Sequence, residues 1–258
     1  MTINGYRNPL ALPHESERER DARERLSHLL ATSPILPEYL IDNLALYLRR
    51  HQLSDLLSMA ELYKMILDVP GVIMEFGVLH GRHLGTLTAL RGMYEPYDTT
   101  RCIVGFDSFT GFPDVSDVDR VSPSAVAGRF ATPTGYPAHL RAVLEAHEGV
   151  EPSGHIRRNL VVEGDVRETV PEYLSAHPET VIALAYFDLD VYTPTRVVLD
   201  AIRPYLTCGS IVAFDEIGYP RWPGETIAVR EVAGLADVAL RKLATPRDPP
   251  VVYLRWAT

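Results

Sequence analysis

Acidic residues recur along the chain, each directly after a short apolar run of the kind that forms a buried strand. Five such positions occur, two of them doubled: Glu75, Asp107, Asp165, Asp188 with Asp190, and Asp215 with Glu216. A single Asp at such a place is often only a helix cap. Five in succession are hard to explain as caps alone, so they indicate a shared ligand site.

The last four of these carboxylates predict a metal site. Asp188 and Asp190 follow one expected strand, Asp215 and Glu216 follow the next, and adjacent strands would bring them together. Carboxylates that converge in a partly buried cleft cannot all stay ionised without positive charge. Neither motif contains Lys or Arg, although Arg221 follows soon after. A divalent cation that prefers oxygen ligands is the economical partner. The alternative is exposed carboxylates that never converge.

Glycines follow the first expected strand. That strand ends near Glu75, and Gly77, Gly81 and Gly85 come next. Glycine lets a turn approach a ligand closely, although many strand-to-helix turns need it for steric reasons only. The stretch lacks the Gly-x-Gly-x-x-Gly pattern of dinucleotide-binding proteins, which counts against a nicotinamide-dependent oxidoreductase.

The elements that would hold these residues alternate between strand and helix, which predicts a doubly wound, mostly parallel α/β sheet. Ligands of such sheets bind beyond the carboxyl ends of the strands. Asp165 and Thr193 are expected to be N-caps, with Pro194 at the first helical position. Strands are expected at 72–75, 101–106, 160–162, 181–187 and 211–214, helices at 83–93, 138–147, 166–177, 193–206 and 224–235, and a closing hairpin at 239–243 and 251–256.

Two further regions lie outside this pattern. Residues 1–13 are expected to be an arm of little order, followed by helices at 15–30 and 39–67, so that 1–70 would form an arm and helical cap packed on a core domain of 71–258. The segment 111–137 is too long for an ordinary connection. It is predicted to be a mobile lid, with a plain surface excursion as the alternative.

Composition narrows the function. The 258 residues carry a net charge of −9, which argues against nucleic-acid binding. The sequence has no signal-peptide core and no apolar run near the ~20 residues of a membrane span, so a cytoplasmic protein without membrane contact is expected. Cys102 and Cys208 cannot build a disulfide framework and are expected to be buried thiols.

Five motifs together have the order and spacing of one family: Glu75-Phe-Gly-Val-Leu-His-Gly81, Phe106-Asp-Ser-Phe-Thr-Gly-Phe-Pro113, Glu163-Gly-Asp165, Phe187-Asp-Leu-Asp-Val-Tyr192 and Phe214-Asp-Glu216. The chain resembles the macrocin O-methyltransferase family, whose members methylate sugar hydroxyls of antibiotics. An enediyne pathway such as that of calicheamicin is one setting that this resemblance suggests. The resemblance implies a seven-stranded class I methyltransferase (Rossmann-like) sheet, S-adenosylmethionine and Mg²⁺ or another divalent cation as cofactors, a deoxysugar of a glycosylated natural product as acceptor, and a homo-oligomer.

The resemblance also implies roles for individual residues. Asp190 would be the general base, and Asp188 would serve catalysis and lie near the cofactor. Glu216 stands where many relatives have Asp, and its longer side chain could still ligate. The other implied roles are these: Glu75, Gly77 and Gly81 around the methionine moiety, Arg82 and His83 near its carboxylate, Asp107 on the ribose hydroxyls, Ser108 and Phe109 along the adenosine, Asp165 and Val166 at the adenine, and Asp188, Asp215 and Glu216 as metal ligands.

Several alternatives stay open. A metal-dependent catechol or phenol methyltransferase would use the same residues, and a non-catalytic S-adenosylmethionine-binding subunit would need only Glu75 and Asp107. A nicotinamide-dependent oxidoreductase is a more distant possibility. Other candidates for the base are His80, His83 and His139, and the aromatic residues that could stack on a sugar or aglycone are Tyr192, Tyr219 and Trp222.

Overall fold

The structure, a computed structural model, describes residues 16–257. It falls into two compact units that divide between Ser54 and Asp55, so the predicted boundary after residue 70 lies within the second unit. The expected arm at 1–13 lies outside the described residues. Among these residues no helix is long and apolar enough to cross a membrane.

The first unit is helical. Helix α1 (Glu17–Ala31) begins at a capping box, in which Ser16 Oγ accepts from the Glu19 amide and the Glu19 carboxylate accepts from the Ser16 amide. Helix α2 (Pro37–Asp42) and the 3₁₀ turn η1 (Leu44–Tyr47) follow, and α3 (Arg50–Lys64) runs on into the second unit. The predicted continuous helix over 39–67 is therefore wrong. The helix breaks at Asn43, whose side chain donates to the Tyr39 carbonyl at 2.8 Å and ends α2.

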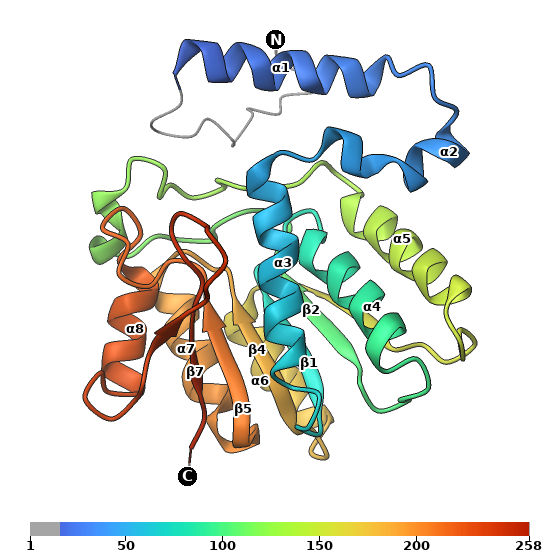
Figure 1. The fold of residues 1–258 in the computed structure, drawn as a ribbon. Helices are drawn as coiled ribbons and strands as arrows, with labels where there is room; N and C mark the ends of the chain where they lie inside the picture. The colour runs from blue at the N-terminus through green and yellow to red at the C-terminus, as the bar shows by residue number, and fades with distance from the viewer. Residues whose placement is uncertain (1–15, 258) are drawn as a thin grey trace. The chain divides into compact units, whose positions relative to one another are not determined.

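The second unit is built on a seven-stranded sheet in the order β3-β2-β1-β4-β5-β7-β6 (Figure 1). The first five strands are parallel, and β7 and β6 complete the sheet as an antiparallel pair. This confirms the predicted fold class and the closing hairpin. The strand bounds are β1 Val72–Phe76, β2 Ile103–Asp107, β3 Asn159–Glu163, β4 Ile182–Phe187, β5 Leu206–Phe214, β6 Arg241–Lys242 and β7 Val252–Arg255.

Helices cover both faces of this sheet, which explains why the central strands read as continuous apolar runs. One core gathers around α3, α4 (Arg82–Tyr94) and α5 (Tyr136–Val150), and the other around α6 (Val166–Ala176), α7 (Tyr192–Ile202) and α8 (Gly224–Val232) (Figure 1). In β1, Ile73 points into the first core and Met74 into the second. Glu75 comes between apolar neighbours and is 1% exposed.

The strand register aligns the carboxyl ends of the central strands. Phe76 is opposite Phe106 on β2 and Phe187 on β4, and Phe187 is opposite Phe214 on β5. The rings of Phe187 and Phe214 stack with centroids 4.9 Å apart. The acidic residues that follow these phenylalanines therefore leave the sheet at one edge.

Two helix starts differ in how they are capped. Asp165 accepts from the Arg167 amide at 3.0 Å, which confirms it as the N-cap of α6. The prediction of Thr193 as a cap is wrong, because α7 begins at Tyr192 and has no cap from its own neighbouring side chains. The Tyr192 amide donates instead to Asp119.

The segment 111–137 is structured in part. It contains the 3₁₀ turn η2 (Asp117–Val121), and Phe112 forms backbone hydrogen bonds with Gly128 and Arg129. Its apolar residues pack with Trp222, which lies between β5 and α8. The prediction of two buried thiols is wrong for Cys208, which is exposed in the part of β5 before the strand enters the core, and Cys102 is only half-buried.

Candidate active site

The turn after β1 packs directly against the acidic turn after β4. The Asp188 amide donates to the Phe76 carbonyl at 2.8 Å, and Gly77 adopts a φ of +90°. A Cβ on Gly77 would lie 1.9 Å from the Asp188 carbonyl oxygen. Glycine is required here for close approach of two backbones, as well as for its backbone angle. Gly81, also at positive φ, is the N-cap residue before α4, and a Cβ there would meet the Leu140 side chain at 2.3 Å.

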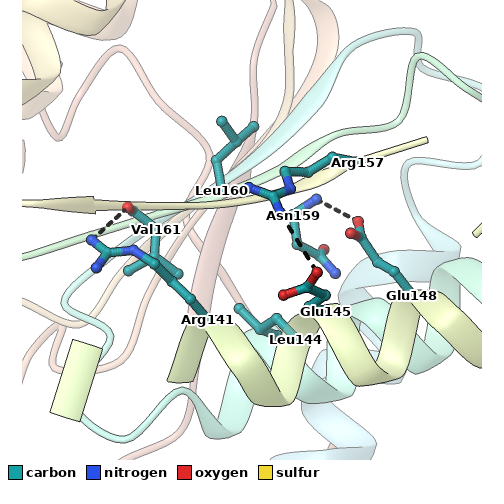
Figure 2. Close-up of a pocket in the computed structure, with 8 residues that line it drawn as sticks. All are labelled: Arg141, Leu144, Glu145, Glu148, Arg157, Asn159, Leu160 and Val161. Atoms are coloured by element: carbon teal, nitrogen blue, oxygen red, sulfur yellow. Dashed lines mark hydrogen bonds and ion pairs between the residues drawn. The ribbon is translucent and has the colours of Figure 1, made fainter. Parts of the chain in front are cut away.

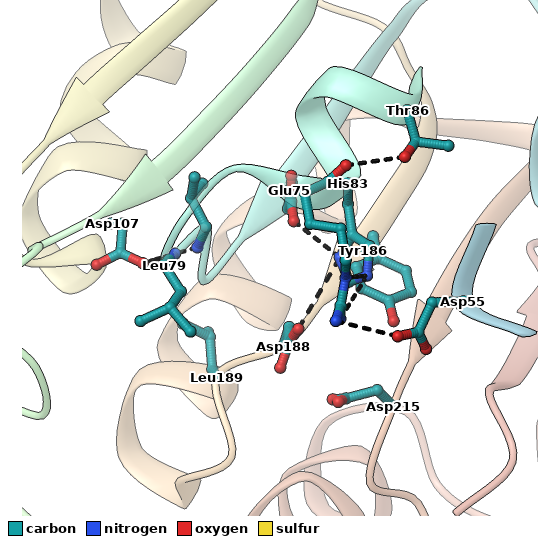
Figure 3. Close-up of polar contacts among 12 residues, drawn as sticks. Asp55, Glu75, Leu79, His83, Thr86, Asp107, Tyr186, Asp188, Leu189 and Asp215 are labelled. Carbon is teal, nitrogen blue, oxygen red and sulfur yellow. Dashed lines mark hydrogen bonds and ion pairs between the residues drawn. The ribbon is translucent and has the colours of Figure 1, made fainter. Parts of the chain in front are cut away.

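Glu75 and His83 form a buried pair beneath this turn (Figure 3). Glu75 Oε1 is 3.0 Å from His83 Nδ1, while Glu75 Oε2 has no hydrogen-bond partner. Burial raises the pKa of Glu75 well above its usual value and lowers the pKa of His83 well below its own. The unpartnered oxygen is an acceptor that a positively charged ligand group would satisfy.

Asp107 connects the end of β2 to the glycine turn. Its Oδ2 accepts from the Val78 and Leu79 amides at 2.7 Å each (Figure 3 labels Asp107 and Leu79), and its Oδ1 accepts from the Phe109 amide at 2.6 Å. Ser108 donates its hydroxyl to the Gly111 carbonyl, and Phe109 is buried in the core. The structure thus places Asp107 at the turn, where its carboxylate fixes the backbone, and contact with the ribose hydroxyls stays a prediction.

Asp165, one of the two residues expected at the adenine, is bound by the side chain of Arg167, a contact that the sequence analysis did not predict. The Asp165 carboxylate binds the Arg167 guanidinium, and Arg167 also contacts Asp114 at 2.8 Å. These bonds to Arg167 keep the pKa of Asp165 below its usual value, although burial alone would raise it. Val166 is buried in the apolar core. Contact of either residue with adenine stays a prediction.

Asp188 after β4 and Asp215 after β5 lie at the same edge of the sheet (Figure 3), and the charge of Asp215 acts on Asp188, Asp190 and Glu216. Burial and then the charge of Asp215 raise the pKa of Asp188 well above its usual value, and raise that of Asp190 to about 8. The same two causes raise the pKa of Glu216 to about 10. This mutual repulsion is what the sequence analysis anticipated for converging carboxylates.

Arg247, in the connection between β6 and β7, supplies positive charge that the sequence analysis missed. Its Nη2 is 3.1 Å from Asp215 Oδ2, and its Nε is 3.1 Å from Asp55 Oδ1. Asp55 also pairs with Arg82 at 3.0 Å. Neither acidic motif contains Lys or Arg, as the sequence showed, but Arg247, 32 residues beyond Asp215, supplies positive charge to the same carboxylates. The predicted hairpin could have indicated this contact. Because β7 runs antiparallel to β5, the connection that precedes β7 and contains Arg247 lies at the acidic edge of the sheet.

The donor chemistry at this edge suits a hard cation, but the side chains do not stand as a ready ligand set. Asp215 Oδ1 and Glu216 Oε2 are buried without hydrogen-bond partners. Among residues 16–257, however, no three His, Cys, Asp or Glu side chains are grouped closely enough to hold a metal. Arg247 occupies the second oxygen of Asp215. The oxygen donors of the three expected ligands suit a divalent cation in chemistry, but they would have to draw together to bind it, and metal binding stays a prediction.

Glu225 is a second residue that sequence reasoning missed. It lies in the first turn of α8, is fully buried, and accepts from the amides of Leu189 and Glu216 at 3.4 and 3.1 Å. Its carboxylate therefore bridges the two acidic turns. A Glu at a helix start is common because of the positive helix end, so nothing in the sequence pattern distinguishes Glu225.

The remaining candidates lie in varied surroundings. His80 and His139 are exposed and lie against the Tyr136 ring, and the alternative base His83 is already bonded to Glu75. Trp222, one of the aromatic residues that could stack on a sugar or aglycone, lies in the loop before α8 and is buried against Phe112 and Phe130. Tyr219 packs in the same cluster, and Tyr192 donates its hydroxyl to Glu231.

A small cavity of about 150 Å³ lies elsewhere, between α5 and the edge strand β3 (Figure 2). It is lined by residues such as Arg141, Glu145 and Asn159, and by none of the predicted site residues. Glu148 on its wall accepts from the Arg158 and Asn159 amides at 2.6 and 2.7 Å. These contacts serve packing at the edge of the sheet.

The chain is similar to solved structures of methyltransferases. It is 60% identical to CalS11, described as calicheamicin methyltransferase, over 100% of both chains with a TM-score of 0.92. It is 55% identical to an apo structure of CalS11, described as TDP-rhamnose 3'-O-methyltransferase of calicheamicin biosynthesis, over 98% of this chain and 100% of that one with a TM-score of 0.83. The O-methyltransferase NovP shares the fold at 20% identity, 80% coverage of both chains and a TM-score of 0.63. No protein-family model and no curated protein sequence matches the chain.

We expect Arg247→Gln to destabilise the fold by about 3–5 kcal/mol, because it leaves buried carboxylate charge without its partner. In an Asp215→Asn background the same substitution should cost about 1–3 kcal/mol less, the coupling energy of the pair. Urea unfolding of the four proteins measures both quantities. Arg241→Gln, at an exposed position on β6, is the matched control. Additive effects of the two substitutions would show that Arg247 and Asp215 do not interact.

Proposed function

The chain belongs to the family of sugar O-methyltransferases that includes CalS11, and we propose that it methylates a hydroxyl of a nucleotide-activated deoxysugar. The observation that carries the proposal is the 55–60% identity to CalS11 over the whole chain. One of those structures is described as acting on TDP-rhamnose at the 3' oxygen. We therefore favour the 3'-hydroxyl of TDP-rhamnose as the acceptor over the finished glycoside that the sequence analysis expected.

S-adenosylmethionine is the proposed methyl donor, and the turn after β1 fits it. Gly77 keeps side-chain atoms away from the meeting point of the β1 and β4 ends, and Glu75 Oε2 offers a buried acceptor to a cationic group. Asp107 holds the turn rigid through three amide bonds. When bound, the cofactor supplies an electrophilic methyl group on a sulfonium. The protein's contribution is to align the acceptor oxygen with it.

Asp190 is the proposed general base. A sugar hydroxyl must lose its proton as its oxygen takes the methyl group, and an ordinary carboxylate is a weak base for that proton. Burial and the neighbouring Asp215 raise the pKa of Asp190 to about 8, so its ionised carboxylate is a stronger base than an ordinary carboxylate. Asp190 lies three residues beyond the end of β4, in the same turn as Asp188, whose backbone contacts the glycine turn that would hold the cofactor.

Mg²⁺ or another divalent cation is proposed as a second cofactor, with Asp188, Asp215 and Glu216 as its ligands. The two unpartnered carboxyl oxygens of Asp215 and Glu216 support this assignment. A bound cation would lower the pKa of a coordinated hydroxyl. Arg247 and Arg82 already bring positive charge to the same edge and hold it there through Asp55.

Two other expectations remain proposals. A phenolic acceptor would suit the same base, but no specific observation favours it over the sugar. Assembly into a homo-oligomer is supported by apolar side chains on the first unit that are exposed, such as Leu36, Tyr39 and Ile41. A cytoplasmic location likewise stays a prediction.

Incubated with S-adenosylmethionine and TDP-rhamnose, the purified protein should give a singly methylated sugar nucleotide. Asp190→Asn should lower kcat by about 10²–10⁴, since general-base catalysis contributes that much. Asp200→Asn, an exposed position on α7, should leave kcat unchanged. Mass spectrometry follows the product. Equal kcat for Asp190→Asn and wild type would exclude Asp190 as the base, and absence of product with any deoxysugar nucleotide would refute the proposed function.

Removal of divalent metal with a chelator should abolish most of this turnover, and added Mg²⁺ should restore it. Asp188→Asn should raise the Mg²⁺ concentration needed for half-maximal rate, because a ligand has lost its charge. Titration of Mn²⁺ followed by electron paramagnetic resonance gives an independent affinity. Full turnover in chelator, together with no Mn²⁺ binding, would show that Arg247 and Arg82 supply the positive charge alone.

A further inference from the structure

Asp119 is a fully buried carboxylate in the long segment between β2 and α5. It is 0% exposed, although its neighbours Val118 and Arg120 are exposed. Its two oxygens accept from the Tyr192 amide at 3.1 and 3.2 Å, and it also accepts from the Ser116 hydroxyl. The loop side chain thus caps the start of α7, a helix that has no side-chain cap of its own.

The turn that Asp119 caps contains the proposed base. Asp190 adopts a φ of +61°, which few residues other than glycine take up, and the Val191 amide closes the turn onto the Leu189 carbonyl at 2.6 Å. Such a conformation persists only where the surrounding structure enforces it. Here the backbone conformation of Asp190 is held through Val191 and Tyr192, which follow it directly and are fixed by their own contacts.

The same loop also packs on Val191. This side chain is 1% exposed and lies in a cluster with Ala125 and Trp222, to which Phe112 and Phe130 add their rings. The loop therefore contacts both residues that follow Asp190: it packs against Val191 and accepts a hydrogen bond from the Tyr192 amide. In Figure 1 the loop, drawn in green, reaches across to the start of α8.

Gly224 shows how closely these parts fit. A Cβ on this first residue of α8 would lie 2.6 Å from Asp119 Oδ1 and 2.5 Å from the Tyr192 amide nitrogen. Three segments distant in sequence, namely the loop, the start of α7 and the start of α8, converge on one carboxylate. A surface excursion with no role in the site would not need this fit.

From this geometry we infer that Asp119 is a positioning residue: docking of the loop through Asp119 sets the Asp190 turn in its working conformation. The inference rests on the proposed function for the role of Asp190. It assigns to the segment 111–137 a part in assembling the site, through Asp119, Ala125 and the aromatic cluster. Asp119 itself is not expected to touch the substrate or the cofactor, because its oxygens are already bonded to Tyr192 and Ser116.

The test compares Asp119→Ala and Asp119→Asn with Asp117→Asn. Asp117 belongs to the same 3₁₀ turn, but its side chain is 91% exposed and pairs only with Arg120 in the described structure. We expect Asp119→Ala to lower kcat at least tenfold while the KM for S-adenosylmethionine changes less than threefold. Asp119→Asn retains an oxygen acceptor and should recover most of kcat, and Asp117→Asn should match wild type.

Two readouts do not depend on activity. Asp119→Ala should speed tryptic cleavage after Arg120 and Arg129, which lie in the loop, and should raise deuterium uptake in the segment 188–195. If Asp119→Ala does not fold, Ser116→Ala replaces it. This variant removes the hydrogen bond from Ser116 to the Asp119 carboxylate and should give smaller increases in tryptic cleavage and deuterium uptake.

Faster tryptic cleavage with unchanged kcat and unchanged uptake at 188–195 would overturn the inference, because the loop would then be released without affecting the Asp190 turn. Equal behaviour of Asp119→Ala and Asp117→Asn would overturn it as well. If wild type transfers no methyl group, the proposed function fails, and deuterium uptake at 188–195 still decides whether Asp119 holds the turn.

Discussion

Repulsion among carboxylates at the ends of β4 and β5 is the constraint on which the rest of the site depends. The parallel register forces Asp188 and Asp215 out of the sheet at the same edge, and burial leaves their charge poorly solvated. Fixed contacts stabilise these carboxylates and their turns. Arg247 pairs with Asp215, Glu225 accepts from two backbone amides, and backbone hydrogen bonds hold the Asp188 turn. A charge arrangement that would destabilise an ordinary protein is thereby retained, as expected where its reactivity is used.

The charged side chains also connect the two halves of the proposed site. Glu75 contacts His83, Arg82 lies against His83 and pairs with Asp55, and Asp55 pairs with Arg247, which reaches Asp215. The chain of contacts runs from the turn assigned to the methyl donor to the carboxylates assigned to the acceptor. Asp55 lies at its centre although it comes from α3, before the sheet begins.

Much of the fold could be predicted from the sequence because it depends on local patterns. Apolar runs alternating with helical periods gave the parallel strands, and their acidic ends located the site edge. The N-terminal helix pattern over 39–67 failed at Asn43, where one side-chain hydrogen bond ends the helix. Thr193 failed as a cap because Asp119, distant in sequence, had already taken the Tyr192 amide. Arg247, Glu225 and Asp119 were missed for one reason: each acts through contacts that only the folded chain creates.

A crystal structure with demethylated cofactor and TDP-rhamnose would test the central claim most directly, since it locates the acceptor relative to the base. The account predicts the sugar 3'-oxygen within hydrogen-bond distance of the Asp190 carboxylate and facing the cofactor sulfur, with Asp188 and Asp215 on the same side of the sugar. A sugar bound away from Asp190, with its hydroxyls directed to another base, would contradict it.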